Sequence, residues 1–239
     1  MTISFSPIDT VVNSMLLWER FNNPTATAES ASNGNWLPPN YAKAGNTWAQ
    51  DLVGGAGSYP SSAYGNWIKP YSEGVWGDQQ STLDQVIKLD LGETMTEIYG
   101  IAELGEVGDF EYLWTYYDGV DYVANIAGSA IQIGIKIIST TSIGFKVVEY
   151  VNGVAETVSA ANTAPITTAT DAYTGGVPLP FHIEFLSDRI VCTIPEGTKE
   201  ILWTDWLANA PAQLTGTYIG VSFDTNTGSD AYLRDLRVL

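Results

Sequence analysis

The sequence predicts an all-β protein, built as a two-sheet antiparallel sandwich with one long aromatic-rich insertion. Apolar and polar residues alternate along much of the chain at the period of half-buried strands, most strictly in residues 131–137. Tight-turn pairs such as Asn152-Gly153 separate these runs and are typical of hairpins between antiparallel strands. The only expected helical segment is a single turn at 204–211.

Residues 1–14 are expected to form an N-terminal arm ahead of one domain at 15–239. Ile3 and Phe5 alternate weakly before Pro7, which suits an arm or an edge strand better than a central strand. An arm of this kind can add a strand to the sheet of a neighbouring molecule. Ile3 and Phe5 are therefore the predicted partner-binding residues, and the first core strand is expected at 16–21.

Residues 37–81 form the predicted insertion. The composition changes here to Gly, Pro, Asn and Ser interleaved with aromatic side chains, so we expect a structured loop with short strands. On one interpretation the aromatic side chains seal this loop onto the sandwich as a satellite core. On the other they form a platform for a sugar ring or a protein partner. The candidate ligand-binding residues on the second interpretation are Tyr64, Trp67, Tyr71 and Trp76.

The middle of the chain is a series of short apolar runs divided by turns. We expect strand pairs at 84–91 and 96–103, 110–117 and 121–127, 145–151 and 154–158, and 181–186 and 189–194. The turns between them are Gly92-Glu93, Asp118-Gly119, Asn152-Gly153 and Ser187-Asp188. In the expected strand at 189–194, Cys192 shares a face with Ile190 and Ile194. This position indicates a buried, inert thiol.

The two ends of the chain carry motifs that belong together. The last strands, 216–223 and 231–239, enclose a polar loop, and the final strand reads Leu233-Arg-Asp-Leu-Arg-Val238. Leu233 and Leu236 fall out of phase by one residue, which predicts a β-bulge near Arg234 and Asp235. Near the start, Glu19-Arg-Phe-Asn22 precedes Trp36.

This pattern resembles the laminin-G-like and concanavalin-A-like jelly rolls. Those domains often open with an Asp-Phe-Asn-Arg-like segment followed by a Trp, and close with a Leu-Asp-Asp-Val-Arg-Val-like strand. Here Arg234 replaces the first acid of the closing motif. The resemblance implies a jelly roll in which the first strand lies beside the last.

The charge of the chain restricts its partners. The formal net charge is −17, from 27 acidic and 10 basic residues, and such a field repels phosphate backbones and anionic membranes. We expect no nucleic-acid partner. No apolar run approaches the ~20 residues that span a bilayer, so no membrane insertion is expected. The N-terminus shows no secretory signal, and we expect synthesis in the cytoplasm.

Candidate catalytic groups are few in the sequence. Enzymes of the concanavalin-like fold that cleave glycans place carboxylates on one strand in a Glu-x-Asp-x-(x)-Glu pattern. The nearest approach is the set Glu103, Glu106, Asp109 and Glu111. Asp109 and Glu111 could share a face, but no third carboxylate follows at the required spacing. The only histidine, His182, has no Ser or Cys nucleophile motif near it. The sequence therefore predicts no catalytic residue and a protein that is not an enzyme.

One loop offers candidate metal ligands. Asp224, Asn226 and Asp230 provide hard oxygen atoms of the kind that calcium prefers. They match no complete calcium loop, and any turn uses the same residue types. We predict no cofactor, with Ca²⁺ at these residues as the alternative.

The resemblance also implies a function. Lectin-like jelly rolls without a signal peptide are familiar as bacteriophage components, so we expect a noncatalytic virion structural protein in a head decoration, tail or fibre. It would contact other virion proteins and further copies of itself in a homo-oligomer, and could adhere to a cell-surface glycan. Two alternatives stay open: a free carbohydrate-binding protein that uses the aromatic residues of the insertion, and a glycoside hydrolase or lyase.

Overall fold

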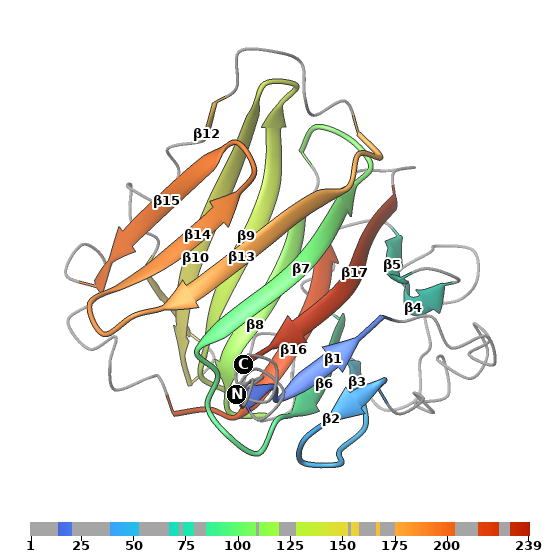
Figure 1. Cartoon of the computed structure of the whole chain (residues 1–239), viewed down its shortest axis with the longest axis vertical. Helices are drawn as coiled ribbons and strands as arrows, with labels where there is room; N and C mark the ends of the chain where they lie inside the picture. Colours follow the sequence, from blue (N-terminus) through green and yellow to red (C-terminus); the bar gives the residue numbers. More distant parts are fainter. Residues whose placement is uncertain are drawn as a thin grey trace, which may run out of the picture.

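A computed structural model describes twelve segments of the chain. They are residues 14–20, 39–52, 67–71, 74–78, 85–108, 110–119, 128–152, 154–157, 166–167, 175–203, 215–224 and 230–239. These segments form an all-β sandwich of two antiparallel sheets (Figure 1), which confirms the predicted fold class. No helix of the described residues is long and apolar enough to cross a membrane.

The first sheet, sheet A, contains nine described strands and joins the two ends of the chain. Its main path runs β15 (Gly197–Leu202), β14 (Arg189–Ile194), β13 (Leu179–Phe185), β7 (Glu97–Leu104), β17 (Asp230–Val238), β1 (Leu17–Glu19) and β2 (Tyr41–Ala42). Two further strands, β4 (Trp67–Tyr71) and β5 (Gly74–Asp78), attach to β17 through β5.

The second sheet, sheet B, contains eight described strands. Its path runs β11 (Val154–Thr157), β10 (Ser142–Val151), β9 (Ala130–Ser139), β8 (Phe110–Tyr117), β16 (Tyr218–Asp224), β6 (Gln85–Asp90) and β3 (Ala49–Leu52), with β12 (Ile166–Thr167) on β10. Consecutive strands β6 and β7 lie in different sheets, so the turn at Gly92 links the two layers instead of closing a hairpin.

The core lies between the sheets and follows the predicted alternation. The isoleucines of β9, at 131, 133, 135 and 137, are all buried, as are the inward-facing residues of β17. Burying each such side chain stabilises the fold by about 1.5–3 kcal/mol. Cys192 is also fully buried, and burial raises the pKa of its thiol. The predicted inert cysteine is confirmed.

The predicted pairing of the two ends is confirmed. Strand β1 pairs antiparallel with β17, and Trp18 lies opposite Arg237. The register of β17 against β7 shifts between Arg234 and Arg237, and Asp235 has a φ of 49°. This is the β-bulge predicted from Leu233 and Leu236, and it changes the direction in which neighbouring side chains point.

Several predicted elements lie outside the described residues. They are the arm with Ile3 and Phe5, the strand at 121–127 and the helical turn at 204–211. Within the predicted insertion, the described residues form short strands, β2 to β5.

Candidate functional site

The outer face of sheet B is buried around Trp114. Trp114 on β8 lies opposite Gln132, which lies opposite Val148, and all three point away from the inner row that contains Leu113 and Ile133. Trp114, Gln132 and Val148 are at most 2% exposed. The Trp114 indole N–H donates to the Ser222 hydroxyl at 2.7 Å, and both groups are buried. The part of this face around Trp114 is therefore packed.

The acidic pair noted on β8 forms no site among the described side chains. Asp109 lies outside the described residues, and Glu111 is placed by its backbone only, opposite Ile135. The described side chains of the cluster on the outward face of β8 are Trp114 and Tyr117.

The outer face of sheet A is open and carries a row of residues in register. Because residues directly opposite each other in antiparallel strands share a face, six consecutive strand pairings align one residue from each of seven strands. From β15 to β2 this cross-strand row is Thr198, Thr193, His182, Tyr99, Arg237, Trp18 and Tyr41.

Ring systems dominate the middle of the cross-strand row. The Tyr99 and His182 rings stack with centroids 4.0 Å apart and planes 7° apart. On the other side of Tyr99, the Arg237 guanidinium lies 6.0 Å from the centre of the Trp18 ring. Tyr99 and Tyr41 are 37% and 38% exposed. Flat apolar surface with polar edges is therefore available to solvent across several strands.

The bulge in β17 supplies the polar groups beside these rings. Asp235 accepts hydrogen bonds from the Trp18 indole N–H at 2.9 Å and from the Arg237 guanidinium at 2.7 Å. In a regular strand the inward Leu233 would place Asp235 inward and Leu236 outward, whereas the bulge leaves Leu236 buried and puts Asp235 on the outer face with Arg237. The bulge predicted from Leu233 and Leu236 therefore determines which polar side chains of β17 lie on the outer face.

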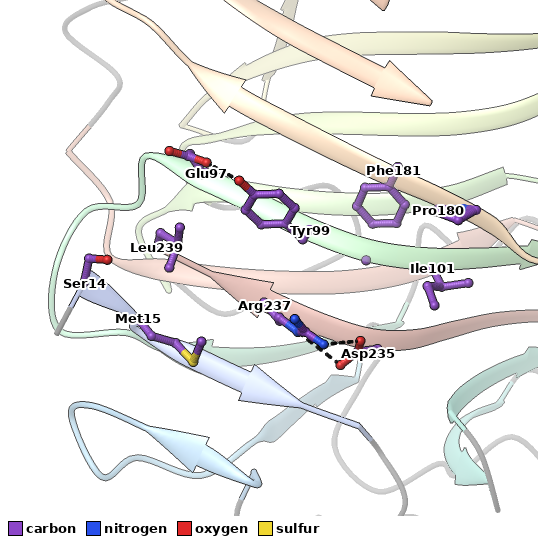
Figure 2. A pocket seen from close by; sticks show the side chains of 11 residues that line it. Ser14, Met15, Glu97, Tyr99, Ile101, Pro180, Phe181, Asp235, Arg237 and Leu239 are labelled. Atoms are coloured by element: carbon purple, nitrogen blue, oxygen red, sulfur yellow. Dashed lines mark hydrogen bonds and ion pairs between the residues drawn. The ribbon is translucent and has the colours of Figure 1, made fainter. Parts of the chain in front are cut away.

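A pocket of about 620 Å³ lies along the same part of sheet A. Figure 2 shows Glu97 and Tyr99 on one side of it and Arg237 and Asp235 on the other. Met15 also lines the pocket. The pocket therefore lies along β7 and the bulged strand, at the middle of the cross-strand row.

Three potential proton or metal ligands cluster beside Tyr99. Glu97 on β7 lies directly opposite Glu184 on β13, and His182 precedes Glu184 on the same face. One donor atom from each of the three lies within 4.8 Å of the others. The His182 Nε2 to Glu97 Oε2 distance is 3.1 Å, and the Tyr99 hydroxyl donates to the same oxygen at 2.5 Å.

The environment of Tyr99 keeps its hydroxyl protonated. Burial of the phenol, the hydrogen bond to Glu97 and the negative charges of Glu97 and Glu184 raise the pKa of Tyr99 to about 12. The hydroxyl is therefore a fixed donor that holds the Glu97 carboxylate in place at neutral pH.

The residues predicted to bind a ligand stay a prediction, because their side chains are not described. Trp67 and Tyr71 lie on β4 and Trp76 on β5, and only their backbones are described. Tyr64 lies outside the described residues. The aromatic residues of the cross-strand row come instead from β7, β1 and β2. In the sequence, these residues could be recognised only as polar and aromatic residues at outward positions of strands. The register that aligns them across the sheet is not visible in the sequence.

The predicted calcium ligands are not placed as one site either. Asp224 ends β16 in sheet B, and Asp230 begins β17 in sheet A. Asn226 lies outside the described residues, and the side chains of the other two are not described. Calcium at these positions stays a prediction.

Comparisons with known proteins identify the fold. No family model and no curated protein matches the sequence. Among solved structures, a β-glucanase of Bacillus licheniformis has a TM-score of 0.52 and 14% identity, covering 93% of this chain and 96% of its own. The catalytic domain of an endo-1,3-β-glucanase (laminarinase) from Thermotoga petrophila RKU-1 has a TM-score of 0.51 and 10% identity, covering 94% and 96%.

A third similar structure comes from work on endo-acting O-glycanases that members of the human gut microbiota express to initiate mucin breakdown. Its TM-score is 0.51 at 11% identity, over 94% of this chain and 98% of that one. At these identities the likeness establishes the fold alone, a jelly-roll β-sandwich. The jelly-roll part of the predicted resemblance is confirmed.

The predicted function is corrected by the same comparisons. A noncatalytic virion protein, and with it the absence of enzymatic activity, is contradicted because the three similar structures described above come from work on glycanases. The prediction failed because it rested on fold analogy with phage components and on a carboxylate pattern sought within one strand. The structure instead brings Glu97 and Glu184 together from two strands. The expected self-association stays a prediction.

Proposed function

We propose that the protein is a carbohydrate-active enzyme that binds a glycan chain across the outer face of sheet A and cleaves it at Glu97 and Glu184. The observation that carries this proposal is the cross-strand row of aromatic and charged residues, which runs past the pocket and the paired carboxylates. The jelly-roll fold shared with glycanases supports it.

The cross-strand row has the chemistry that sugars require. Each pyranose ring has an apolar face of C–H groups that packs on aromatic rings, and hydroxyls around its edge. Tyr99 and Trp18 lie two strands apart, about 10 Å at the usual strand spacing, which is close to the length of a disaccharide. A glycan laid across the strands can therefore stack alternate sugars on the two rings.

Polar side chains next to these rings supply directional contacts. Arg237 offers N–H donors and Asp235 offers carboxylate acceptors, and their mutual ion pair holds both in place. The net charge of −17 disfavours anionic polysaccharides through long-range repulsion. The proposed substrate is therefore a neutral glycan.

The carboxylate pair fits cleavage with retention of configuration. In retaining glycosidases the two carboxyl groups lie only about 5–5.5 Å apart, and oxygen atoms of Glu97 and Glu184 approach within 4.8 Å. Glu97, held by Tyr99 and His182, is the proposed nucleophile, and Glu184 the proposed acid. Glu97 forms a bond to the anomeric carbon while the glycosidic bond breaks and the Glu184 proton passes to the leaving oxygen. Water then attacks the anomeric carbon and gives a proton to Glu184, while the bond between the sugar and the Glu97 carboxylate breaks.

Two measurements on the full chain test binding and cleavage separately. Affinity electrophoresis in laminarin and in mixed-linkage β-glucan measures retention, and a reducing-end assay measures cleavage. We expect Glu97→Gln and Glu184→Gln to lower cleavage by about 10² or more, as loss of an acid or base does, while retention stays. Glu196→Gln, in the exposed turn between β14 and β15, is the matched control.

The outcomes separate the two parts of the proposal. Retention without new reducing ends in the wild type would remove the cleavage step and leave a carbohydrate-binding protein. Absence of retention on these and on mucin-type O-glycans would remove the proposal altogether.

A further inference from the structure

We infer that Glu97, His182 and Glu184 form a binding site for one divalent ion of the zinc class. The site would occupy the two carboxylates assigned above to glycan cleavage, so the bound ion would act as an inhibitor. The metal site stands on its own geometry, whereas the inhibition rests on the proposed function.

The first argument is the placement of two like charges. Glu97 and Glu184 lie directly opposite each other on neighbouring antiparallel strands, an arrangement in which like charges repel. Among the described residues, Glu184 makes no ion pair, and Glu97 pairs only with His182. The nearest cation along the cross-strand row, Arg237, is engaged by Asp235. A divalent cation between the carboxylates would remove this repulsion.

The second argument is the spacing of the donor atoms. Zinc binds imidazole nitrogen at about 2.0–2.1 Å and carboxylate oxygen at about 2.0–2.2 Å in tetrahedral geometry, which places neighbouring ligand atoms roughly 3.3 Å apart. His182 Nε2 and Glu97 Oε2 are 3.1 Å apart, and the third donor lies within 4.8 Å of both. A small rotation of the Glu184 side chain would complete three corners of a tetrahedron.

The third argument is that two of the ligands are already oriented. Stacking on Tyr99 fixes the plane of the His182 ring, and the Tyr99 hydroxyl holds the shared Glu97 oxygen. Metal sites in proteins commonly fix their ligands through such outer contacts.

The ligand types select the class of ion. Calcium takes six to eight oxygen ligands, whereas this cluster offers one imidazole nitrogen and two carboxylates. Imidazole with carboxylate suits zinc and neighbouring transition metals. A solvent-accessible fourth position would take water, since the side chains of His182 and Glu97 are 25% and 33% exposed. The site therefore discriminates against calcium.

Isothermal titration of ZnCl₂ into the full chain, stripped of metal with a chelator, tests the site directly. We expect one ion per chain at neutral pH, and affinity lowered at least tenfold in Glu184→Gln. Glu196→Gln removes one exposed carboxylate elsewhere and should bind as the wild type does. Thermal melts without metal show that each variant is folded. Equal zinc affinity in the wild type and Glu184→Gln, or no zinc binding at all, would overturn the inference.

A spectroscopic arm identifies the nitrogen ligand. Electron paramagnetic resonance with Cu²⁺ as the probe should show coupling to one imidazole nitrogen in the wild type, and His182→Asn should abolish it. CaCl₂ should give no titration heat. Retention of the nitrogen coupling in His182→Asn, or calcium binding as tight as zinc, would place the ion elsewhere and refute the assignment.

An activity arm separates this inference from the proposed function. Zinc at its binding concentration should suppress release of reducing ends, and chelator should restore it. Zinc binding in a chain that cleaves no glycan would refute the proposed function and leave the metal site standing. A chain that cleaves glycan, binds no zinc at these residues and is not inhibited by zinc would refute the metal site and leave the proposed function standing.

Discussion

The two outer faces of the sandwich differ in what their strands present to solvent. On sheet B, Trp114 and Gln132 lie side by side and are almost fully buried. On sheet A, Tyr99 lies between His182 and Arg237, and more than a third of Tyr99 is exposed. An aromatic residue on an outward strand position therefore does not by itself indicate a binding surface. What distinguishes the two faces is whether the aromatic ring remains accessible.

The difference between the faces predicts different roles for the two aromatic residues Trp114 and Tyr99. Burial of Trp114 contributes packing and a hydrogen bond inside the fold, so its removal should mainly change stability. Tyr99 contributes to the stack and to the orientation of Glu97, so its removal should mainly change binding. Three kinds of variant test this difference between the faces: a truncation that affects both faces, substitutions that each affect one face, and a substitution that removes one oxygen atom.

Removal of residues 232–239 should have the largest effect. It deletes most of β17, the strand that pairs with β7, β1 and β5, together with Leu233, Leu236 and Val238, all fully buried. Each is worth about 1.5–3 kcal/mol against a net stability of about 5–15 kcal/mol. We expect no cooperative thermal transition by circular dichroism. A truncated chain with the same thermal transition as the wild type would show that the core between the two sheets does not depend on β17.

Trp114→Ala should have the next largest effect and sharpen the contrast. Deleting a buried tryptophan costs about 3–5 kcal/mol, measured by denaturant unfolding. Tyr99→Ala is the matched change on the open face and should cost about 1 kcal/mol or less, while glycan retention is lost. Similar losses of stability in the two variants would mean that sheet A is as well covered as sheet B.

Tyr99→Phe should have the smallest effect, confined to alkaline solution. The pKa of Tyr99 in the fold, about 12, is above its ordinary value of 10.0. The protonated phenol therefore adds stability that is complete below pH 10 and is lost as pH rises towards 12. The melting temperature of Tyr99→Phe should decline less than that of the wild type over this range. Tyr41→Phe, on the same face, controls for the chemical change, and an identical decline in all three proteins would contradict the assignment.

Much of the fold was predictable because its signals are local. The alternating isoleucines of β9 predicted a strand with one buried face, and Asn152-Gly153 predicted the hairpin between β10 and β11. In that turn Asn152 has a φ of 48°, a value that Asn tolerates better than most residues. The phase shift between Leu233 and Leu236 predicted the bulge. Each inference needed only neighbouring residues and the geometry of a strand.

The candidate site could not be predicted because it depends on which strands become neighbours. Glu97 and His182 are 85 positions apart, and Trp18 and Asp235 are 217 apart. A slip of one residue in either pairing would turn the side chains of that strand to the opposite face. The search for carboxylates within one strand therefore missed Glu97 and Glu184.

The sequence by itself determined the all-β class, several turns, the bulge and the burial of Cys192. The tertiary structure decided the order of the strands, the register that aligns the cross-strand row, and which outer face stays open. The physical reason is that alternation specifies which side of a strand faces the core, whereas strand partners are chosen by packing between segments distant in the chain.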